Sequence, residues 1–257
     1  MNLLILVLVS FGASWLTFFC GFGLGTMLTP VFYMLFGDLE IAIFATTIVH
    51  FLNNVFKFLL MKKSINWQVA IPFGLAAIPA AFLGAWLLTH FDDFQILSYQ
   101  LFGKTWHVMA MNLVFGIILS GFALVELIPS WSLAFSKQKL WVGGFISGFF
   151  GGLSGHQGAL RTAFLVKYKL EKNVFIATGI VVALVVDIVR STVYFSDLEK
   201  SMNIQWSLII ISLSAALIGA ITGRYFLQKI KLETLNIIVS IAMLVFGVSL
   251  ALGFLNK

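Results

Sequence analysis

The sequence predicts an all-α polytopic membrane protein. It would be built from two inverted repeats, each a broken or re-entrant helical hairpin followed by three transmembrane helices. Three observations predict this fold class. The composition is too apolar for a protein surrounded by water, six apolar segments are long enough to cross a bilayer, and two further apolar segments are interrupted by glycines. These segments occur in the same order in both halves of the chain.

The composition points to lipid as the solvent. Of the 257 residues, 60% are hydrophobic and 10% are charged, whereas soluble domains carry about 25% charged residues. The mean hydropathy is +1.03. We therefore expect a multi-pass protein of the plasma (inner) membrane, and we attribute the net charge of +6 to loop bias rather than to nucleic-acid binding. Because Cys20 is the single cysteine, neither an intrachain disulfide nor a cysteine metal cluster is expected.

Six apolar segments satisfy the length of about 20 residues that a transmembrane helix needs. Each ends in polar residues, and three have a tryptophan at or directly before the first residue, where an interfacial aromatic belt would place it. The six predicted spans are 40–60, 67–90, 107–127, 174–195, 206–228 and 234–254, with Trp67, Trp106 and Trp206 at three of the starts.

The remaining apolar segments, 1–36 and 140–167, are broken by glycines. Only 11 residues separate Lys139 from Gly151, about 17 Å of helix, which reaches the middle of a roughly 30 Å hydrocarbon core. We therefore predict that 140–167 is a re-entrant hairpin, and that 1–36 is a matching hairpin with a longer first arm. Whether residues 1–20 cross the membrane fully or form only that arm stays open.

The loop charges agree with this topology. Lysines gather in loops 61–66, 128–139, 167–173 and 229–233, and the other loops lean acidic. All basic loops fall on the cytoplasmic side, as the positive-inside rule requires, only if 140–167 enters and leaves on that side. The chain then crosses six times, with both termini outside.

The two halves, 1–128 and 129–257, carry similar segments in the same order. Gly21–Leu28 lies over Gly155–Thr162 in this comparison, and later segments also match. A hairpin plus three crossings is an odd number of crossings, so the second repeat would be inserted upside down. Inverted repeats with helices broken near the midplane are typical of secondary transporters that work by alternating access.

The repeated glycine-rich break, Pro30 after the first one, and the chain length together resemble the sulfite exporter TauE/SafE family over the whole chain. The family's second motif looks like Gly-Leu-Thr-Gly-Ile-Gly-Gly-Gly-Pro. Here Gly152-Leu-Ser-Gly-His-Gln-Gly-Ala-Leu160 keeps that frame, but His156 replaces the Ile, Gln157 a Gly and Leu160 the Pro. The resemblance implies a permease for sulfite or an organosulfonate such as sulfoacetate, with no cofactor.

The second break is the candidate substrate site. A half-helix beginning near Gly155 would offer unpaired backbone N–H groups and a positive dipole end to an anion. Arg161 and Gln157 lie one turn apart, and a guanidinium fork suits a sulfonate. The alternative is that the glycines only pack helices and that Arg161 binds a carbonyl or a lipid headgroup. The expected substrate-binding residues are Arg161, Gln157, His156, Gly155, Gly158, Gly23, Gly25, Asn53 and Asn54.

Four further polar residues are candidates for coupling or gating. His50 and Lys57 lie on a polar stripe of span 40–60, where His50 could instead be a packing residue and Lys57 could reach the cytoplasmic surface. Asp187 and Arg190 are three residues apart, so they form either a structural ion pair or a pair that carries a coupling proton.

Two other functions remain alternatives. A passive anion channel would have the same pore without an alternating gate. An intramembrane serine protease would use the Gly-x-Ser-Gly pattern at Gly152–Gly155, but its serine needs a base and no histidine follows His156. We therefore expect no enzyme. The direction of transport, proton coupling and a homodimer stay open.

Overall fold

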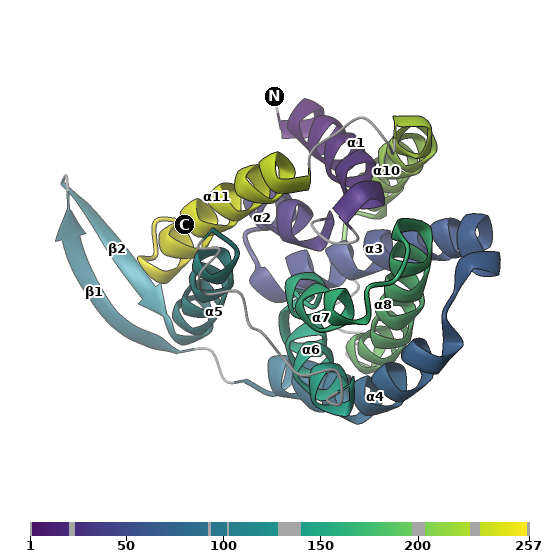
Figure 1. Ribbon diagram of the computed structural model, residues 1–257. Helices are drawn as coiled ribbons and strands as arrows, with labels where there is room; N and C mark the ends of the chain where they lie inside the picture. The colour runs from purple at the N-terminus through teal and green to yellow at the C-terminus, as the bar shows by residue number, and fades with distance from the viewer. Residues whose placement is uncertain are drawn as a thin grey trace.

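The computed structural model describes residues 2–20, 24–91, 94–101, 103–127, 140–196, 204–226 and 232–255. Most of these residues are helical, and four helices are long and apolar enough to cross a membrane: Leu39–Ser64, Trp67–Thr89, Lys172–Phe195 and Trp206–Tyr225. Several shorter apolar helices accompany them (Figure 1). The predicted all-α polytopic class is confirmed.

The helices follow the predicted segments closely. In the first half they are α1 (Asn2–Cys20), α2 (Leu24–Phe36), α3 (Leu39–Met61), η1 (Lys62–Ser64), α4 (Trp67–Thr89) and α5 (Ala110–Leu127). In the second half they are α6 (Leu140–Ser154), α7 (Gly158–Leu165), η3 (Val166–Tyr168), α8 (Lys172–Phe195), α10 (Trp206–Phe226) and α11 (Leu232–Ala251).

One predicted span starts in the wrong place. The segment 107–127 becomes helical only at Ala110, because the residues before it form a β-hairpin of β1 (Gln95–Leu101) and β2 (Lys104–Met109). Trp106 therefore lies in a strand and not at a helix start. Thr, Trp and Val are favoured in strands, and the pairing with β1 satisfies backbone groups that an isolated helical turn would leave open.

Capping side chains set two helix starts. Asp38 Oδ1 accepts a hydrogen bond of 2.9 Å from the Ile41 amide at the start of α3, and Asn66 Oδ1 accepts one of 3.2 Å from the Val69 amide at the start of α4. Asn66 also donates its backbone N–H to Thr178 Oγ1 on α8, at 3.0 Å. The end of α3 and the start of α8 thus lie at the same end of the bundle, which we call the basic end because it carries Lys62 and Lys63.

Glycines bring α6 against α4. A Cβ on Gly148 would lie 2.5 Å from the Ala77 carbonyl oxygen, and Gly144 and Gly152 approach the α4 backbone one turn to either side. Small residues at such spacing let membrane helices pack closely. Because the contacts advance along both helices in the same direction, α6 runs parallel to α4, from the basic end into the bundle.

The helix α7 returns beside α6. A Cβ on Gly143 would meet the Phe164 ring, and Ser147 Oγ donates a hydrogen bond to the Gln157 carbonyl oxygen at 3.1 Å. The chain thus enters through α6, turns at Ser154 to Gly158, and goes back through α7 to η3 at the basic end.

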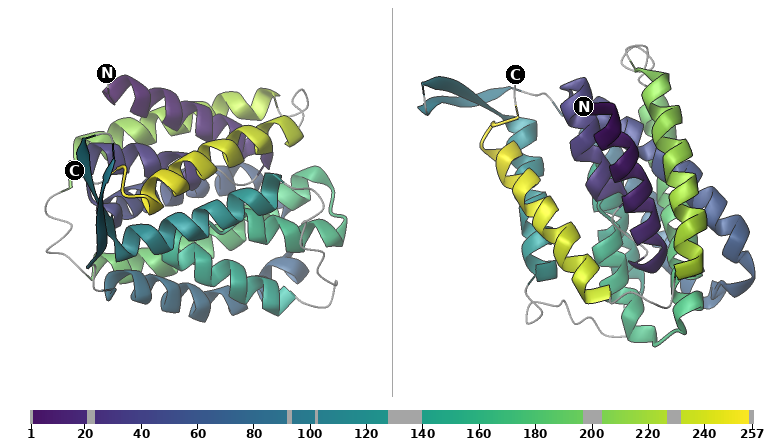
Figure 2. Two further views of the ribbon diagram at one scale, coloured as in Figure 1. Left: turned by 90° about the vertical axis from the view of Figure 1, so that its left-hand side faces the viewer. Right: turned by 90° about the horizontal axis from the view of Figure 1, so that it is seen from above.

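The helix α1 packs along α10, much as α6 packs along α4 (Figures 1 and 2). Ser10 and Ser212 share a hydrogen bond of 2.8 Å, and Gly219 lies against the Phe11 backbone. The other large contacts join α5 to α11, α4 to α8, α2 to α3 and α3 to α8. In chain order, α1 to α5 of the first half correspond to α6, α7, α8, α10 and α11 of the second half. If each helix is replaced by its counterpart, each of these helix pairs becomes another pair that is in contact or stays the same pair.

Large apolar side chains also cover the outside of the bundle. On α4 they recur every three or four residues and are 41–54% exposed: Ile71, Leu75, Ile78 and Phe82. A helix face of this kind is stable next to lipid and not next to water.

Candidate functional site

Asp187 on α8 is the centre of a buried polar network. Its Oδ2 lies 2.7 Å from His50 Nδ1 and accepts a hydrogen bond from Asn54 Nδ2 at 3.2 Å, both on α3. Its Oδ1 accepts from Arg190 Nε at 3.0 Å and lies 2.8 Å from Arg190 Nη2. Asp187 is 0% exposed and Arg190 1% exposed. Water does not screen this pair, so the two charges interact strongly.

Arg190 also reaches the turn between α6 and α7. A Cβ added to Gly155 would lie 2.5 Å from Arg190 Nη1. Gly155 has a φ of +79°, a conformation that side chains disfavour, and its amide donates to the Gly151 carbonyl oxygen at 2.9 Å. Glycine is therefore required at this position both by the backbone and by the guanidinium beside it.

The glycine breaks of the two halves meet. A Cβ on Gly25, at the start of α2, would lie 3.6 Å from the Gly155 carbonyl oxygen. Thr29 Oγ1, one turn later, donates to Thr46 Oγ1 of α3 at 3.2 Å. Gly23, which belongs to the same predicted break, lies outside the described residues.

Gln157 is buried at the first turn of α7 with its side-chain amide unused. It is 1% exposed, it precedes Gly158 in the N-cap position, and its side chain makes no capping bond. Neither its Oε1 nor its Nε2 has a hydrogen-bond partner among the described residues. Buried amides are normally hydrogen-bonded, and an unpaired group costs about 1–3 kcal/mol. His156, beside it, is also buried.

Arg161 lies on the basic-end side of the break. It is 3% exposed, and its Nε would lie 3.3 Å from a Cβ on Gly179 of α8. Gly179 precedes Asp187 by eight residues, about 12 Å along the helix. The two guanidinium groups therefore flank the break at different depths, Arg190 at its tip and Arg161 closer to the basic end.

The polar stripe of α3 divides between two neighbours. Asn54 faces α8, whereas Asn53 accepts a hydrogen bond from Ser14 Oγ of α1 at 3.0 Å. Lys57 donates to Thr17 Oγ1 at 2.8 Å and is 3% exposed. The structure thus places Asn53 and Lys57 in a second buried cluster against α1, and the Lys57 ammonium points inward rather than to the surface.

Several residues of these clusters were missed by the sequence reasoning. The Tyr194 hydroxyl donates to the Gly152 carbonyl oxygen and so ties α8 to the end of α6. Its position one turn after Arg190 was the available signal. Ser14 and Thr17 share one face of α1 at a spacing of three, and Gly179 gave no signal in the sequence.

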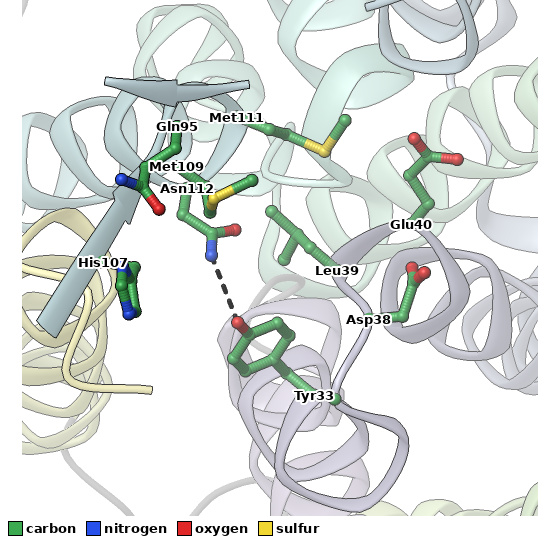
Figure 3. A pocket seen from close by; sticks show the side chains of 10 residues that line it. Tyr33, Asp38, Leu39, Glu40, Gln95, His107, Met109, Met111 and Asn112 are labelled. Carbon is green, nitrogen blue, oxygen red and sulfur yellow. Dashed lines mark hydrogen bonds between the residues drawn. The ribbon is translucent and has the colours of Figure 1, made fainter. Parts of the chain in front are cut away.

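A cavity of about 470 Å³ lies apart from this network, at the end of the bundle opposite the basic end (Figure 3). Asn112 Nδ2 donates to the Tyr33 hydroxyl across it at 3.2 Å. Tyr33 is eight residues from Gly25, about 12 Å along α2. Two of its residues, Asp38 and Glu40, belong to one of the acidic loops of the predicted topology. The lining residues are Tyr33, Gly37, Asp38, Leu39, Glu40, Gln95, His107, Met109, Met111 and Asn112.

Two observations concern the alternatives of a serine protease and a metal site. Ser154, in the Gly-x-Ser-Gly pattern, donates its hydroxyl to the Phe150 carbonyl oxygen of its own helix at 3.0 Å. Within the described ranges, no group of three or more His, Cys, Asp or Glu side chains is arranged to hold a metal ion.

Comparison with curated proteins and with solved structures gave no significant match. The model of one protein family, described as Sulfite exporter TauE/SafE, matches residues 6–250. This match covers nearly the whole chain and confirms the resemblance drawn from the glycine breaks. The chain is therefore a multi-pass membrane protein that belongs to the sulfite exporter TauE/SafE family, a family of membrane transporters for sulfur anions.

Proposed function

We propose that this protein is a secondary transporter that moves sulfite, or an organosulfonate such as sulfoacetate, across the plasma membrane. The anion would bind at the turn between α6 and α7. The observation that carries the proposal is the buried amide of Gln157, which has no described partner although it lies beside the Gly155 turn that Arg190 contacts.

The groups around the turn suit an oxyanion with several acceptor oxygens. Arg190 and Arg161 supply charged N–H donors from two depths, and Gln157 Nε2 supplies a neutral one. The α7 N-terminus adds backbone N–H groups that the Gln157 side chain does not cap. Gly155 lets the Arg190 guanidinium lie against the backbone of the turn, where the ligand would meet it. In this proposal Gly158 and Gly25 line the site from the two breaks. In this proposal His156 lines the same site.

Asn53 and Asn54 have different roles in the proposal. Asn54 holds the Asp187 carboxylate that positions Arg190. Asn53 and Lys57, on the α1 side, line the approach from the basic end. This assignment follows from their described partners and differs from the expectation that both asparagines contact the anion.

Alternating access would follow from two inverted repeats, 1–128 and 129–257. The packing of α1 along α10, like that of α6 along α4, and the meeting of Gly25 with Gly155 support this division. Rocking of one repeat against the other would open the site to each side in turn.

Proton coupling would act through the Asp187 network. His50 and Arg190 both contact the Asp187 carboxylate. A proton on that carboxylate would weaken its hold on Arg190, and the guanidinium would then be available to the anion. In this proposal His50, Asp187 and Arg190 therefore act together in proton coupling.

The test is ligand-induced thermal stabilisation of the purified protein. Sulfite, thiosulfate, sulfoacetate, taurine and carboxylates of matched size are compared, because a ligand of the folded state raises the unfolding temperature. We expect a rise with at least one sulfur anion and its loss in Gln157→Ala. The control is Gln100→Ala, in the exposed hairpin. A Gln157→Ala protein that keeps the full shift would contradict the proposed site.

A passive channel would use the same residues, so binding alone does not exclude it. Counterflow of labelled substrate in proteoliposomes distinguishes the two, because a channel gives no transient accumulation. We expect accumulation above equilibrium.

A further inference from the structure

The β1–β2 hairpin has two chemically different faces. Residues directly opposite each other in an antiparallel pair lie on the same face of the sheet. The register pairs Leu97 with Val108 and Tyr99 with Trp106, so these four side chains share one face. The next pair on that face is Leu101 with Lys104. The other face carries Ser98, His107, Gln100 and Thr105.

The apolar face is only partly covered by the protein. Val108, at the base of the hairpin, is 4% exposed, whereas Leu97 is 47% and Leu101 38% exposed. Tyr99 and Trp106 are half-buried. A face of this composition needs an apolar environment beyond the one that this chain provides.

The covered part of this face rests on the end of α11. The Tyr99 hydroxyl donates to the Leu252 carbonyl oxygen at 2.7 Å, and the Trp106 ring packs edge-on against Phe254 at 5.0 Å between centroids. Gly253, with a φ of +72°, lies against the His107 carbonyl oxygen, where a side chain would collide. The apolar face is thus attached to the end of a helix that lies in the membrane.

That helix carries an exposed apolar stripe that leads to the hairpin. Its members recur every three or four residues and are 41–62% exposed: Ile241, Val245, Val248 and Leu252. They lie on the outside of the bundle, where lipid is the neighbour. Because the stripe ends at Leu252, beneath Tyr99, the lipid-facing surface of α11 continues onto the apolar face of the hairpin.

The hairpin also lies in the orientation of a membrane surface. Figure 2 shows both strands at one end of the helices, running across the helix axes and extending sideways beyond α11. A strand of seven residues is about 23 Å long. The distal part of the hairpin therefore lies beside the end of the bundle, beyond α11.

We propose that the β1–β2 hairpin is a lipid-surface element. It lies in the headgroup region with Leu97, Tyr99, Leu101 and Trp106 toward the acyl chains. Tyr and Trp are the residues that the membrane interface favours. Lys104 is on the same face, where its ammonium reaches lipid phosphates while its stem follows the apolar surface. Anionic phospholipids are therefore its preferred partners.

A second copy of the chain fits this surface less well. A stable protein interface buries about 800 Å² and 20–30 residues on each side. The exposed apolar face of the hairpin consists of two leucines and the edges of two rings. Lipid binding needs no such minimum buried area on the hairpin, because the same lipids also cover the neighbouring α11 stripe.

The test measures the depth of two neighbouring residues in lipid nanodiscs. With Cys20→Ser as background, a fluorophore is attached to Leu101→Cys on the apolar face, or to Gln100→Cys on the polar face. We expect iodide in the water to quench the Gln100→Cys label at least threefold more strongly, and lipids with a doxyl group in the upper acyl chain to quench the Leu101→Cys label more strongly. Equal quenching at both positions would overturn the proposal.

Two controls keep the result interpretable. Both labelled proteins must unfold at the temperature of the background protein, and the pair Leu97→Cys and Ser98→Cys repeats the comparison if one does not. Replacing neutral lipid by phosphatidylglycerol should deepen the Leu101→Cys label, and Lys104→Gln should remove that effect. Protection of Leu101→Cys that appears in detergent and grows with protein concentration would instead identify a dimer contact and contradict lipid binding.

Discussion

Arg190 occupies the space in which a side chain on Gly155 would begin. The distance from its Nη1 to a Cβ at that position would be 2.5 Å, and the same guanidinium holds Asp187 through Nε. The break between α6 and α7 is therefore connected directly to the buried network that joins α8 to α3. A substitution at the break should therefore perturb the hydrogen bonds of Asp187, and a substitution of Asp187 should alter the conformation of the break.

Gly155→Ala tests this connection. The substitution puts a side chain into a left-handed backbone conformation, which costs about 1–2 kcal/mol, and it displaces Arg190. We expect substrate uptake in proteoliposomes to fall at least tenfold and the unfolding temperature to drop. Gly121→Ala on α5 is the matched control, because its Cβ would meet no atom within 4 Å. A Gly155→Ala protein as active as Gly121→Ala would show that the contact has no functional role.

Asp187→Asn tests the network itself. The change keeps the shape but removes the negative charge beside Arg190, and breaking a buried ion pair by removing one partner typically costs about 3–5 kcal/mol. We expect a clear loss of thermal stability, part of which the double variant Asp187→Asn with Arg190→Gln should recover. The four unfolding measurements form a double-mutant cycle, and additive losses would mean that the two residues do not depend on each other.

Arg161→Ala tests whether the second guanidinium contacts the anion. We expect sulfur-anion binding, measured as thermal stabilisation, to be abolished while expression stays normal. Arg161→Lys keeps the charge but loses the planar fork, so its affinity should fall about tenfold, or about 1.4 kcal/mol. Wild-type affinity in Arg161→Ala would remove this residue from the binding site.

Cysteine accessibility tests the topology. We expect membrane-impermeant reagents to label Lys63→Cys and Lys169→Cys from the same, cytoplasmic side, because η1 packs against α8 at the basic end and η3 leads into the start of that helix. Gln100→Cys, in the hairpin, should react only from the other side. If Lys63→Cys and Lys169→Cys reacted from opposite sides, α6 and α7 would not return the chain to the side from which it came.

Much of the helical structure could be predicted from local patterns. The starts of α3 and α4 follow from an apolar run preceded by Asp38 or Asn66, whose side chains cap the first turn. The start of α5 could not be predicted, because the strand β2 depends on pairing with β1. Pairing partners are chosen by the tertiary structure and leave only a weak signal in composition.

The candidate site was predictable as a set of residues and not as an arrangement. Charged and amide side chains in apolar helices stand out, since lipid makes them costly, and so His50, Asp187, Arg190, Gln157 and Arg161 were all identified. The spacing of three between Asp187 and Arg190 predicted their pairing, which is present. The spacing on α3 did not reveal that Asn53 and Asn54 face different helices, because adjacent residues on a helix point about 100° apart and only the neighbours decide what each one meets.

By itself, the sequence determined that lipid surrounds this chain, where most of its helices begin and which glycines interrupt them, because these properties depend on composition and on contacts within a few residues. Only the tertiary structure decided that Gly155 lies beneath Arg190, that Gly25 meets Gly155, and that the hairpin rests on the end of α11. Those relationships join parts of the chain that are far apart in sequence, and their geometry is set by how closely whole helices and strands can pack.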